Sequence, residues 1–165
     1  MDRLAELTSL MISYMSGDAR RIQHFIKVHG FAALLGRQEG MNDEELFVLE
    51  SAALVHDIGI KNGEAKHGKG CCTGKHQEEE GPAVAREMLL KLQYDEPTVE
   101  RVCYLVGHHH TYNSIEGLDY QLLVEADFLV NLYEDSCSKE AVKNVMDKIF
   151  KTKSGIRLCK IMYEI

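Results

Sequence analysis

The feature that most constrains this chain is a histidine followed directly by an aspartate, His56 and Asp57, at the end of an apolar segment. Upstream, the apolar runs 46–49 and 52–55 recur at helical spacing, so residues 43–57 are predicted to form a largely buried helix. An imidazole and a carboxylate at the inner end of such a helix are costly to remove from water. They therefore need hydrogen-bonded partners, an opposite charge or a metal ion.

Three other segments contain groups that can complete this arrangement. They are His24 in an amphipathic stretch, the histidine triplet 108–110, and Asp127 within the apolar segment 122–132. A lone histidine near an apolar face is more often a satisfied core residue, and a lone buried aspartate can simply be hydrogen-bonded. The set is more informative, because each member falls on a separate predicted helix near its inward face. Imidazoles together with carboxylates favour manganese, iron, nickel, cobalt or zinc over magnesium or calcium.

The composition fits one domain that spans residues 1–165. A chain of 165 residues with 45% hydrophobic content can bury a substantial core, and its 2 prolines mark no interdomain linker. No apolar segment approaches the roughly 20 residues that are needed to cross a bilayer. The N-terminal stretch lacks the basic region and cleavage site of a signal peptide. We therefore expect a cytoplasmic protein without a membrane partner.

The charge and the cysteines narrow the function classes. A formal net charge of −7 argues against nonspecific nucleic-acid binding through bulk attraction. The 5 cysteines do not have zinc-ribbon spacing, since Cys71 and Cys72 are adjacent, so reduced thiols in a cytosolic protein are the simpler account. The alternative is a small structural zinc site at this pair, between His67 and His76.

The pattern along the chain predicts an all-α fold, a single compact bundle of roughly six to eight helices with no convincing strand. The predicted helices cover residues 3–15, 18 to about 35, 43–57, a segment from around Pro82, a segment from near Pro97 to the histidine triplet, about 119–134, and one or two further segments. Residues 58–76 break all periodicity, and their glycines predict a loop with a functional role.

Positive charge in this loop could bind a phosphate. Its lysines alternate with glycines, and they are Lys61, Lys66, Lys69 and Lys75. Exposed backbone amides and ammonium groups can hold phosphate, although a flexible solvated loop is the alternative. Arg20 and Arg21, one turn before His24, are further candidates, whose alternative role is a solvated helix surface. The predicted substrate-binding residues are Arg20, Lys61 and Lys75.

These residues together resemble the HD-domain superfamily of metal-dependent phosphohydrolases. The pattern of that family is a histidine on one helix, a His-Asp pair on another, further histidines and a late aspartate. The order here is the same, namely His24, His56-Asp57, His108-His109 and Asp127, in the contexts RRIQHFIKV, AALVHDIG and VEADFLVN. The resemblance covers about residues 18–135, which we take as the motif-bearing core.

The resemblance implies a ligand set and a reaction. The first metal ion would be held by His24, His56, Asp57 and Asp127. In two-metal members Asp57 would bridge, and His108 and His109 would bind the second ion, with His110 as the alternative. The cofactor would be one or two divalent transition-metal ions, and the reaction hydrolysis of a phosphate ester by a metal-activated water. Asp57 would be a catalytic residue.

Two family positions differ in this chain. Many members place a histidine four residues before a glycine at the start of the fourth helix, and counting back from Gly81 gives Gln77. His76 lies one position away and is a candidate ligand of the second metal. A lysine often follows the HD-x-G element directly, whereas here Ile60 occupies that place and Lys61 comes next. Lys61 is therefore the candidate catalytic lysine.

The predicted function is hydrolysis of a phosphate ester of a small metabolite or nucleotide, with that phosphorylated molecule as the partner. Two alternatives use the same side chains. Some HD-fold proteins house a di-iron centre that oxidises substrates with O₂, and a regulatory module could retain metal only for stability. The amphipathic terminal helices are also compatible with a homodimer.

Overall fold

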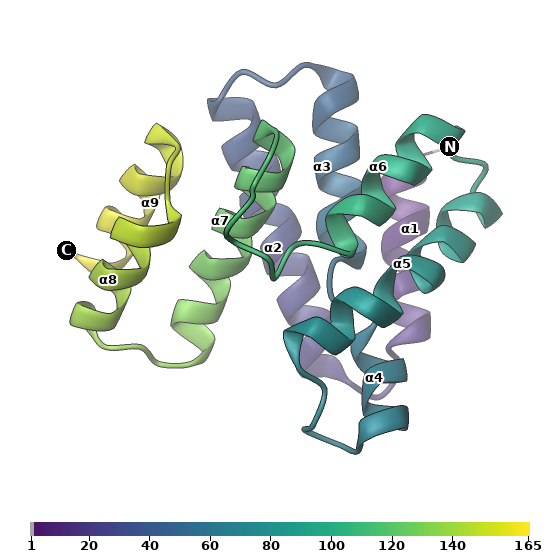
Figure 1. Cartoon of the computed structure of the whole chain (residues 1–165). Coiled ribbons are helices and arrows are strands. Elements are labelled where there is room, and N and C mark those ends of the chain that lie inside the picture. Colours follow the sequence, from purple (N-terminus) through teal and green to yellow (C-terminus); the bar gives the residue numbers. More distant parts are fainter. Residues whose placement is uncertain (1) are drawn as a thin grey trace.

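Nine helices make up the described part of the chain, residues 2–165, in a computed structural model (Figure 1). They are α1 Arg3–Tyr14, α2 Ala19–Gln38, α3 Asp43–Val55, α4 Ile60–His67, α5 Gly74–Lys91, α6 Glu96–Val106, α7 Leu118–Glu134, α8 Lys139–Ile149 and α9 Lys153–Tyr163. Residues 2–165 contain no strand, which confirms the all-α prediction. Within the same range no helix has the length and apolar character needed to span a membrane.

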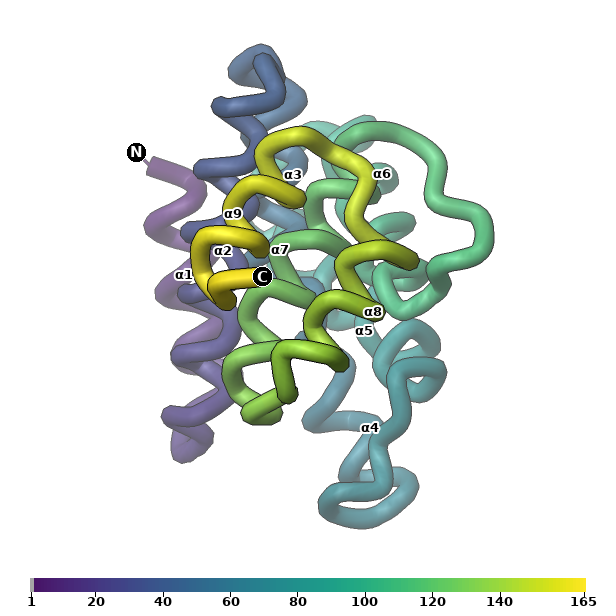
Figure 2. The backbone as a smooth tube through the Cα atoms, turned by 90° about the vertical axis from the view of Figure 1, so that its left-hand side faces the viewer, coloured from purple at the N-terminus to yellow at the C-terminus, as the bar shows by residue number. Residues whose placement is uncertain are grey.

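Helices α2, α3 and α7 form the centre of the bundle (Figure 1). Helix α2 packs against both α3 and α7, α3 also contacts α1 and α6, and α5 packs on α4 and α6. Figure 2 shows α8 and α9 lying over α7, where they close the bundle on that side. Fully buried side chains such as Phe25, Leu54 and Leu122 join the three central helices in one core. Groups on the inner faces of these helices are consequently shielded from water.

Local capping signals explain where several helices begin. The Asp18 carboxylate accepts a hydrogen bond from the backbone N–H of Arg21 at the start of α2. Asn42 and Glu45 form a reciprocal capping box at the start of α3. Asp95 caps α6, whose first turn contains a proline. The predicted starts of these three helices are therefore confirmed, and each depends on contacts within four residues.

Two predicted helix boundaries are wrong. Helix α2 continues through Gly36 to Gln38 instead of ending near residue 35. Gly36 serves close helix packing here, because a Cβ at this position would lie 2.7 Å from Leu46 Cδ1. Helix α5 begins at Gly74 rather than around Pro82, because Thr73 caps it: the hydroxyl of Thr73 accepts from the N–H of His76. Pro82 lies inside the helix.

The segment 58–76, predicted to be a loop, is largely helical. Residues 60–67 form α4, and the irregular part shrinks to residues 68–73 before α5. Gly63 is buried in α4, where an added Cβ would collide with the sulfur of Cys72. Gly63 therefore permits a close approach of α4 to Cys72 and does not mark an irregular backbone. This short helix raises the number of helices in the described chain to nine, above the predicted six to eight.

The turn between α3 and α4 lies directly against α5. A Cβ added to Gly59 would lie 2.5 Å from the backbone nitrogen of Gly81 and 2.6 Å from the carbonyl oxygen of Gln77. Gly81 in turn faces Val106 of α6 closely. The absence of side chains at both glycines lets the turn that carries His56 and Asp57 approach α5.

The substitution Gly59→Ala is expected to destabilise the protein by about 1–3 kcal/mol, because the new methyl group would meet backbone atoms that cannot rotate away. Urea unfolding measures this change. Gly30→Ala in α2 is the matched control, since a Cβ there has open space and a helix favours alanine over glycine by about 1 kcal/mol. Equal unfolding midpoints for the two variants would contradict the close approach of this turn to α5.

Candidate metal centre

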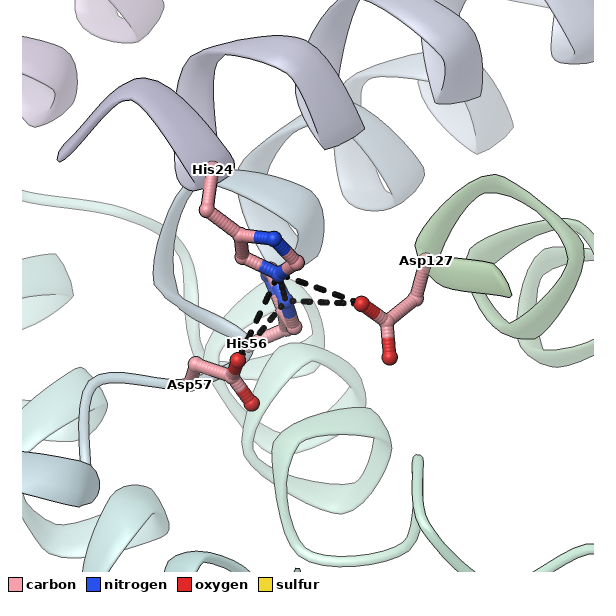
Figure 3. A group of neighbouring side chains, drawn as sticks. All are labelled: His24, His56, Asp57 and Asp127. Atoms are coloured by element: carbon pink, nitrogen blue, oxygen red, sulfur yellow. Dashed lines mark hydrogen bonds and ion pairs between the residues drawn. The ribbon is translucent and has the colours of Figure 1, made fainter. Parts of the chain in front are cut away.

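Four polar side chains converge between the three central helices (Figure 3). His24 comes from α2, His56 and Asp57 from the end of α3, and Asp127 from α7. The His24 Nε2 atom lies 3.1 Å from His56 Nε2, 3.2 Å from Asp127 Oδ1 and 3.5 Å from Asp57 Oδ2. One ligand atom from each residue lies within 4.8 Å of the others. The structure thus brings together the four residues predicted to hold the first metal ion.

The end of α3 explains how two adjacent residues reach one point. Successive side chains on a helix project about 100° apart, so His56 and Asp57 could not both face one ion if they lay in the middle of a helix. Helix α3 ends at Val55, and Asp57 lies in the turn that follows. The His56 Nε2 and Asp57 Oδ2 atoms are 3.4 Å apart as a result.

A second group shares Asp57 with the first. Asp57, His109 and His110 also offer ligand atoms that lie within 4.8 Å of one another. The His109 Nε2 atom is 2.9 Å from Asp57 Oδ1, and the His110 Nε2 atom is 3.4 Å from it. Since Oδ2 faces His24 and His56, the two oxygens of Asp57 point to different groups. This is the bridging position that the family resemblance implies.

His108, a predicted ligand of the second metal, lies outside both groups. Its Nδ1 atom is 2.7 Å from the carbonyl oxygen of Tyr104, and its ring stacks on the Tyr104 ring at 4.1 Å. The hydroxyl of Tyr120 lies within hydrogen-bond distance of the carbonyl oxygens of His108 and Thr111, so its single proton ties this turn to α7. The structure therefore pairs His109 with His110, the alternative left open by the sequence.

His76 is also not brought into the second group. Its Nδ1 accepts from the N–H of Thr73 in the helix cap, and its ring stacks on that of His67 at 3.7 Å. The neighbouring Gln77 is buried instead, with its amide oxygen 2.8 Å from His110 Nε2. Gln77 thus stands beside the second group at the position where many family members have a histidine.

The alternative zinc site at Cys71 and Cys72 finds no support in the described chain. Within residues 2–165 the groups that could hold a metal ion consist of histidines and aspartates only. Cys71 is exposed, and burial raises the pKa of the Cys72 thiol, with Glu64 contributing to the same shift. A thiol with a raised pKa is a poor source of the thiolate that binds zinc.

Backbone carbonyls orient two of the histidines. The Nδ1 atom of His56 lies 2.8 Å from the carbonyl oxygen of Ala53, and that of His109 lies 2.9 Å from the carbonyl oxygen of Val106. A carbonyl can only accept, so Nδ1 carries the proton in both rings. The Nε2 atoms that face Asp57 are then the ones available to bind a metal ion.

Side chains orient the other two histidines. His24 Nδ1 lies 3.2 Å from a carboxylate oxygen of Glu134, whose second oxygen is 2.7 Å from the Lys27 ammonium group. His110 Nδ1 lies 3.4 Å from the hydroxyl of Tyr112. A carboxylate that accepts from Nδ1–H both fixes the ring and makes Nε2 more basic. Glu134, Tyr112 and Gln77 were not predicted, since isolated polar residues have no recognisable spacing.

The charge of the cluster fits a bound cation. Burial alone would raise the pKa of Asp127, but hydrogen bonds from His24 and His56 outweigh it and lower that pKa. The pKa of Asp57 is likewise lowered, chiefly by the charge of His56, against the effect of burial. Within residues 2–165 neither aspartate pairs with a lysine or arginine. Two ionised carboxylates among imidazoles therefore make a donor set suited to a divalent transition metal.

The imidazoles respond to the same charges. Burial lowers the pKa of His109, which keeps this ring neutral. For His56, burial alone would lower the pKa, but the carboxylates of Asp57 and Asp127 raise it well above its usual value. A cation at this point would compete with the His56 proton, so metal binding is expected to release protons and to weaken as the pH falls.

An open cavity of about 520 Å³ leads to the cluster and ends at His24 and Asp57. Arg20, a predicted substrate-binding residue, lines this cavity, and so does Lys69, which the sequence did not distinguish from the other loop lysines. Asn131, Glu134 and Asp135 at the end of α7 also line it. A larger groove of about 860 Å³, lined mainly by residues of α3, α6 and the segment 117–119, contains no member of the cluster.

Two other predicted substrate-binding residues point elsewhere. The Lys61 ammonium group donates to the carbonyl of Tyr14 at 2.8 Å and lies 4.6 Å from the centre of that ring. Ile60 lines the cavity instead, because one residue turns a helical side chain by about 100°. Lys75 is exposed in the first turn of α5 and is not among the residues that line the cavity. The structure therefore does not bring Lys61 to the cavity, and its catalytic role stays a prediction.

Comparisons with known proteins show the family and the fold of this chain. The sequence model of the HD domain family matches residues 21–149, a segment that contains both groups. A crystal structure of a predicted HD superfamily hydrolase from an uncultured Thermotogales bacterium is similar in fold, with a TM-score of 0.70 and 23% sequence identity. The similarity covers 98% of this chain and 86% of the other. No curated protein matches the chain.

The substitution His110→Ala is expected to lower the affinity for a second Mn²⁺ ion by at least about 10-fold, because it removes a nitrogen from the second group. Isothermal titration of metal-free protein with Mn²⁺ measures both binding steps. His108→Ala is the matched control and is expected to leave both steps in place, since His108 contacts Tyr104. A loss in the control but not in His110→Ala would reverse the assignment.

The substitution Glu134→Gln is expected to weaken binding of the first Mn²⁺ ion by about 10–100-fold, because a neutral amide polarises His24 less than a carboxylate does. The same titration measures the effect. Glu140→Gln on the exposed side of α8 is the control for the loss of a surface charge. Equal affinities for the two variants would show that Glu134 does not tune His24.

Proposed function

This chain belongs to the HD-domain family, and on that premise we propose that it is a metal-dependent phosphohydrolase that cleaves a phosphate ester of a small metabolite or nucleotide. The observation that carries the proposal is the position of Asp57, whose two oxygens face two histidine-containing groups at the end of one cavity. The fold likeness to a predicted HD superfamily hydrolase supports the same reaction class.

The donor sets define where cations would bind. His24, His56, Asp57 and Asp127 would hold one divalent ion, and Asp57 with His109 and His110 would hold a second. Such ions supply Lewis acidity, which lowers the pKa of a coordinated water from about 15.7 towards about 7 and offsets the charge of a phosphate group.

The protein's own residues bring a phosphate ester to this point. Arg20 and Lys69 place positive charge at the cavity, and their field attracts an anionic substrate in spite of the negative net charge of the chain. Asp57 and Asp127 are weak proton acceptors, because their pKa values are lowered. Their contribution is therefore to hold charge and position rather than to take up protons.

Tyr112 adds a hydrogen-bond donor beside the second group. Its ring packs on Phe128 of α7 at 5.2 Å, and its hydroxyl lies 3.4 Å from His110 Nδ1. Burial raises the pKa of the Tyr112 hydroxyl, and the nearby carboxylates of Asp127 and Asp57 raise it further. The hydroxyl consequently keeps its proton at neutral pH and remains a neutral partner of His110.

The decisive experiment is hydrolysis of p-nitrophenyl phosphate by protein reconstituted separately with Mn²⁺, Fe²⁺, Co²⁺, Ni²⁺ and Zn²⁺. Asp57→Ala is expected to lower kcat/KM by more than about 100-fold and to lose bound metal, because both groups depend on this carboxylate. Metal content by mass spectrometry provides a second readout. His108→Ala is the control that should retain turnover and metal.

Three results would contradict the proposal in different ways. Full turnover by Asp57→Ala would remove Asp57 from the mechanism. O₂-dependent oxidation by the iron form, without phosphatase activity in any metal form, would replace hydrolysis with di-iron chemistry. Metal binding that raises the unfolding temperature, with no turnover of any ester, would leave a regulatory module.

A further inference from the structure

The cavity beside the cluster contains two cations that no other part of the described chain engages. Arg20 and Lys69 both line it, and within residues 2–165 neither side chain forms an ion pair or hydrogen bond. Arg21 differs, since its guanidinium bonds to Asp18 at 2.9 Å and to Glu64 at 2.8 Å. Arg20 and Lys69 are therefore the groups of this cavity that are free to bind an anion.

Two residues near the C-terminal end of α7 give this cavity free hydrogen-bond acceptors. The Asn131 amide nitrogen donates to Asp127 Oδ1 at 2.9 Å, which leaves the Asn131 amide oxygen available. Asp135 also lines the cavity. Its side chain is exposed, and its carboxylate has no partner in the part of the chain described. Glu134 is not free, since it bonds to His24 and Lys27. Two acceptors at one wall suit the O–H donors of a ligand.

The cavity, as lined by the described residues, lacks the large aromatic rings on which nucleobases commonly stack. None of the residues that line this cavity, within positions 2–165, is a phenylalanine, tyrosine or tryptophan, and Ile60 is the one large apolar side chain among them. Proteins commonly hold bases against aromatic rings, with a contribution of about 1–3 kcal/mol per base. The volume of about 520 Å³ nevertheless suits a small organic molecule.

We propose that the substrate is a polyhydroxylated phosphate monoester, a sugar or polyol phosphate, rather than a nucleotide. Arg20 and Lys69 hold its phosphate beside Asp57, and its hydroxyls donate to Asp135 and Asn131. The negative charge of Asp135 also disfavours a second phosphate at that end. This inference rests on the proposed phosphohydrolase function and specifies its substrate class.

The reaction balances without any further reagent. Water supplies the oxygen of the new P–O bond, and the ester P–O bond breaks. The released hydroxyl of the sugar or polyol takes up a proton that the water loses. The products are inorganic phosphate and the free alcohol, and no atom is oxidised or reduced.

The test compares ribose 5-phosphate and glucitol 6-phosphate with adenosine monophosphate and p-nitrophenyl phosphate on the metal-reconstituted protein. The kcat/KM for the two hydroxylated monoesters is expected to exceed that for adenosine monophosphate by at least about 10-fold, the factor for one hydrogen bond to a charged group. Ribose 5-phosphate and adenosine monophosphate share the phosphorylated ribose, so their difference reports on the base.

Variants separate the two ends of the cavity. Asp135→Ala is expected to raise the ratio of KM for glucitol 6-phosphate to KM for p-nitrophenyl phosphate by about 10-fold, because only the former has aliphatic hydroxyls. Asp147→Ala on the exposed side of α8 is the matched control. Lys69→Ala should raise KM for both substrates, with Lys143→Ala as its control.

The outcomes distinguish this inference from the function on which it rests. A kcat/KM for adenosine monophosphate equal to or higher than that for the hydroxylated monoesters would overturn the substrate class and leave the phosphohydrolase intact. An unchanged KM ratio in Asp135→Ala would also overturn it. No turnover of any phosphate ester with any metal would remove the phosphohydrolase function itself.

Discussion

The structure depends on two carboxylates that lie inside the bundle without a lysine or arginine partner within residues 2–165. Asp57 and Asp127 keep their charge because histidines surround them, and the lowered pKa values reflect this attraction. A group of this kind is costly in an apolar interior unless a cation joins it. The point where the central helices α2, α3 and α7 meet is therefore a charged polar site and not part of the apolar core.

Positioning of the cluster relies on groups that never touch a ligand. Gly59 and Gly81 permit the turn with Asp57 to approach α5, because a Cβ at Gly59 would collide with the backbone of α5 and one at Gly81 with the Val106 side chain. The hydroxyl of Tyr120 and the carboxylate of Glu78 hold the turn that follows α6, since Glu78 accepts from the N–H of His110 at 2.9 Å. A small shift in either turn would separate the two oxygens of Asp57 from their histidines. The glycines at positions 59 and 81 therefore serve close packing of the backbone, whereas the sequence pattern of residues 58–76 had indicated a loop.

The charged side chains around the cavity have different roles. Arg21 and Glu64 neutralise each other at its edge, and Glu134 orients His24. The charges left over, Arg20 and Lys69, are the ones that can meet a substrate. Counting lysines and arginines along the chain cannot separate these roles, because a neighbour from a distant segment decides whether a charge is engaged.

Periodicity and capping residues were enough to predict the helical class and most helix positions, because contacts such as Asn42 with Glu45 span three residues. The ordered histidines and aspartates likewise predicted the first group, since apolar neighbours mark His24, the pair His56-Asp57 and Asp127 as inward-facing in their segments. Three features followed from the tertiary structure alone. They are the helix formed by residues 60–67, the position of His110 rather than His108 beside Asp57, and the contact of Lys61 with Tyr14. Each results from packing between segments far apart in the chain, and such packing has no periodic trace in the order of residues.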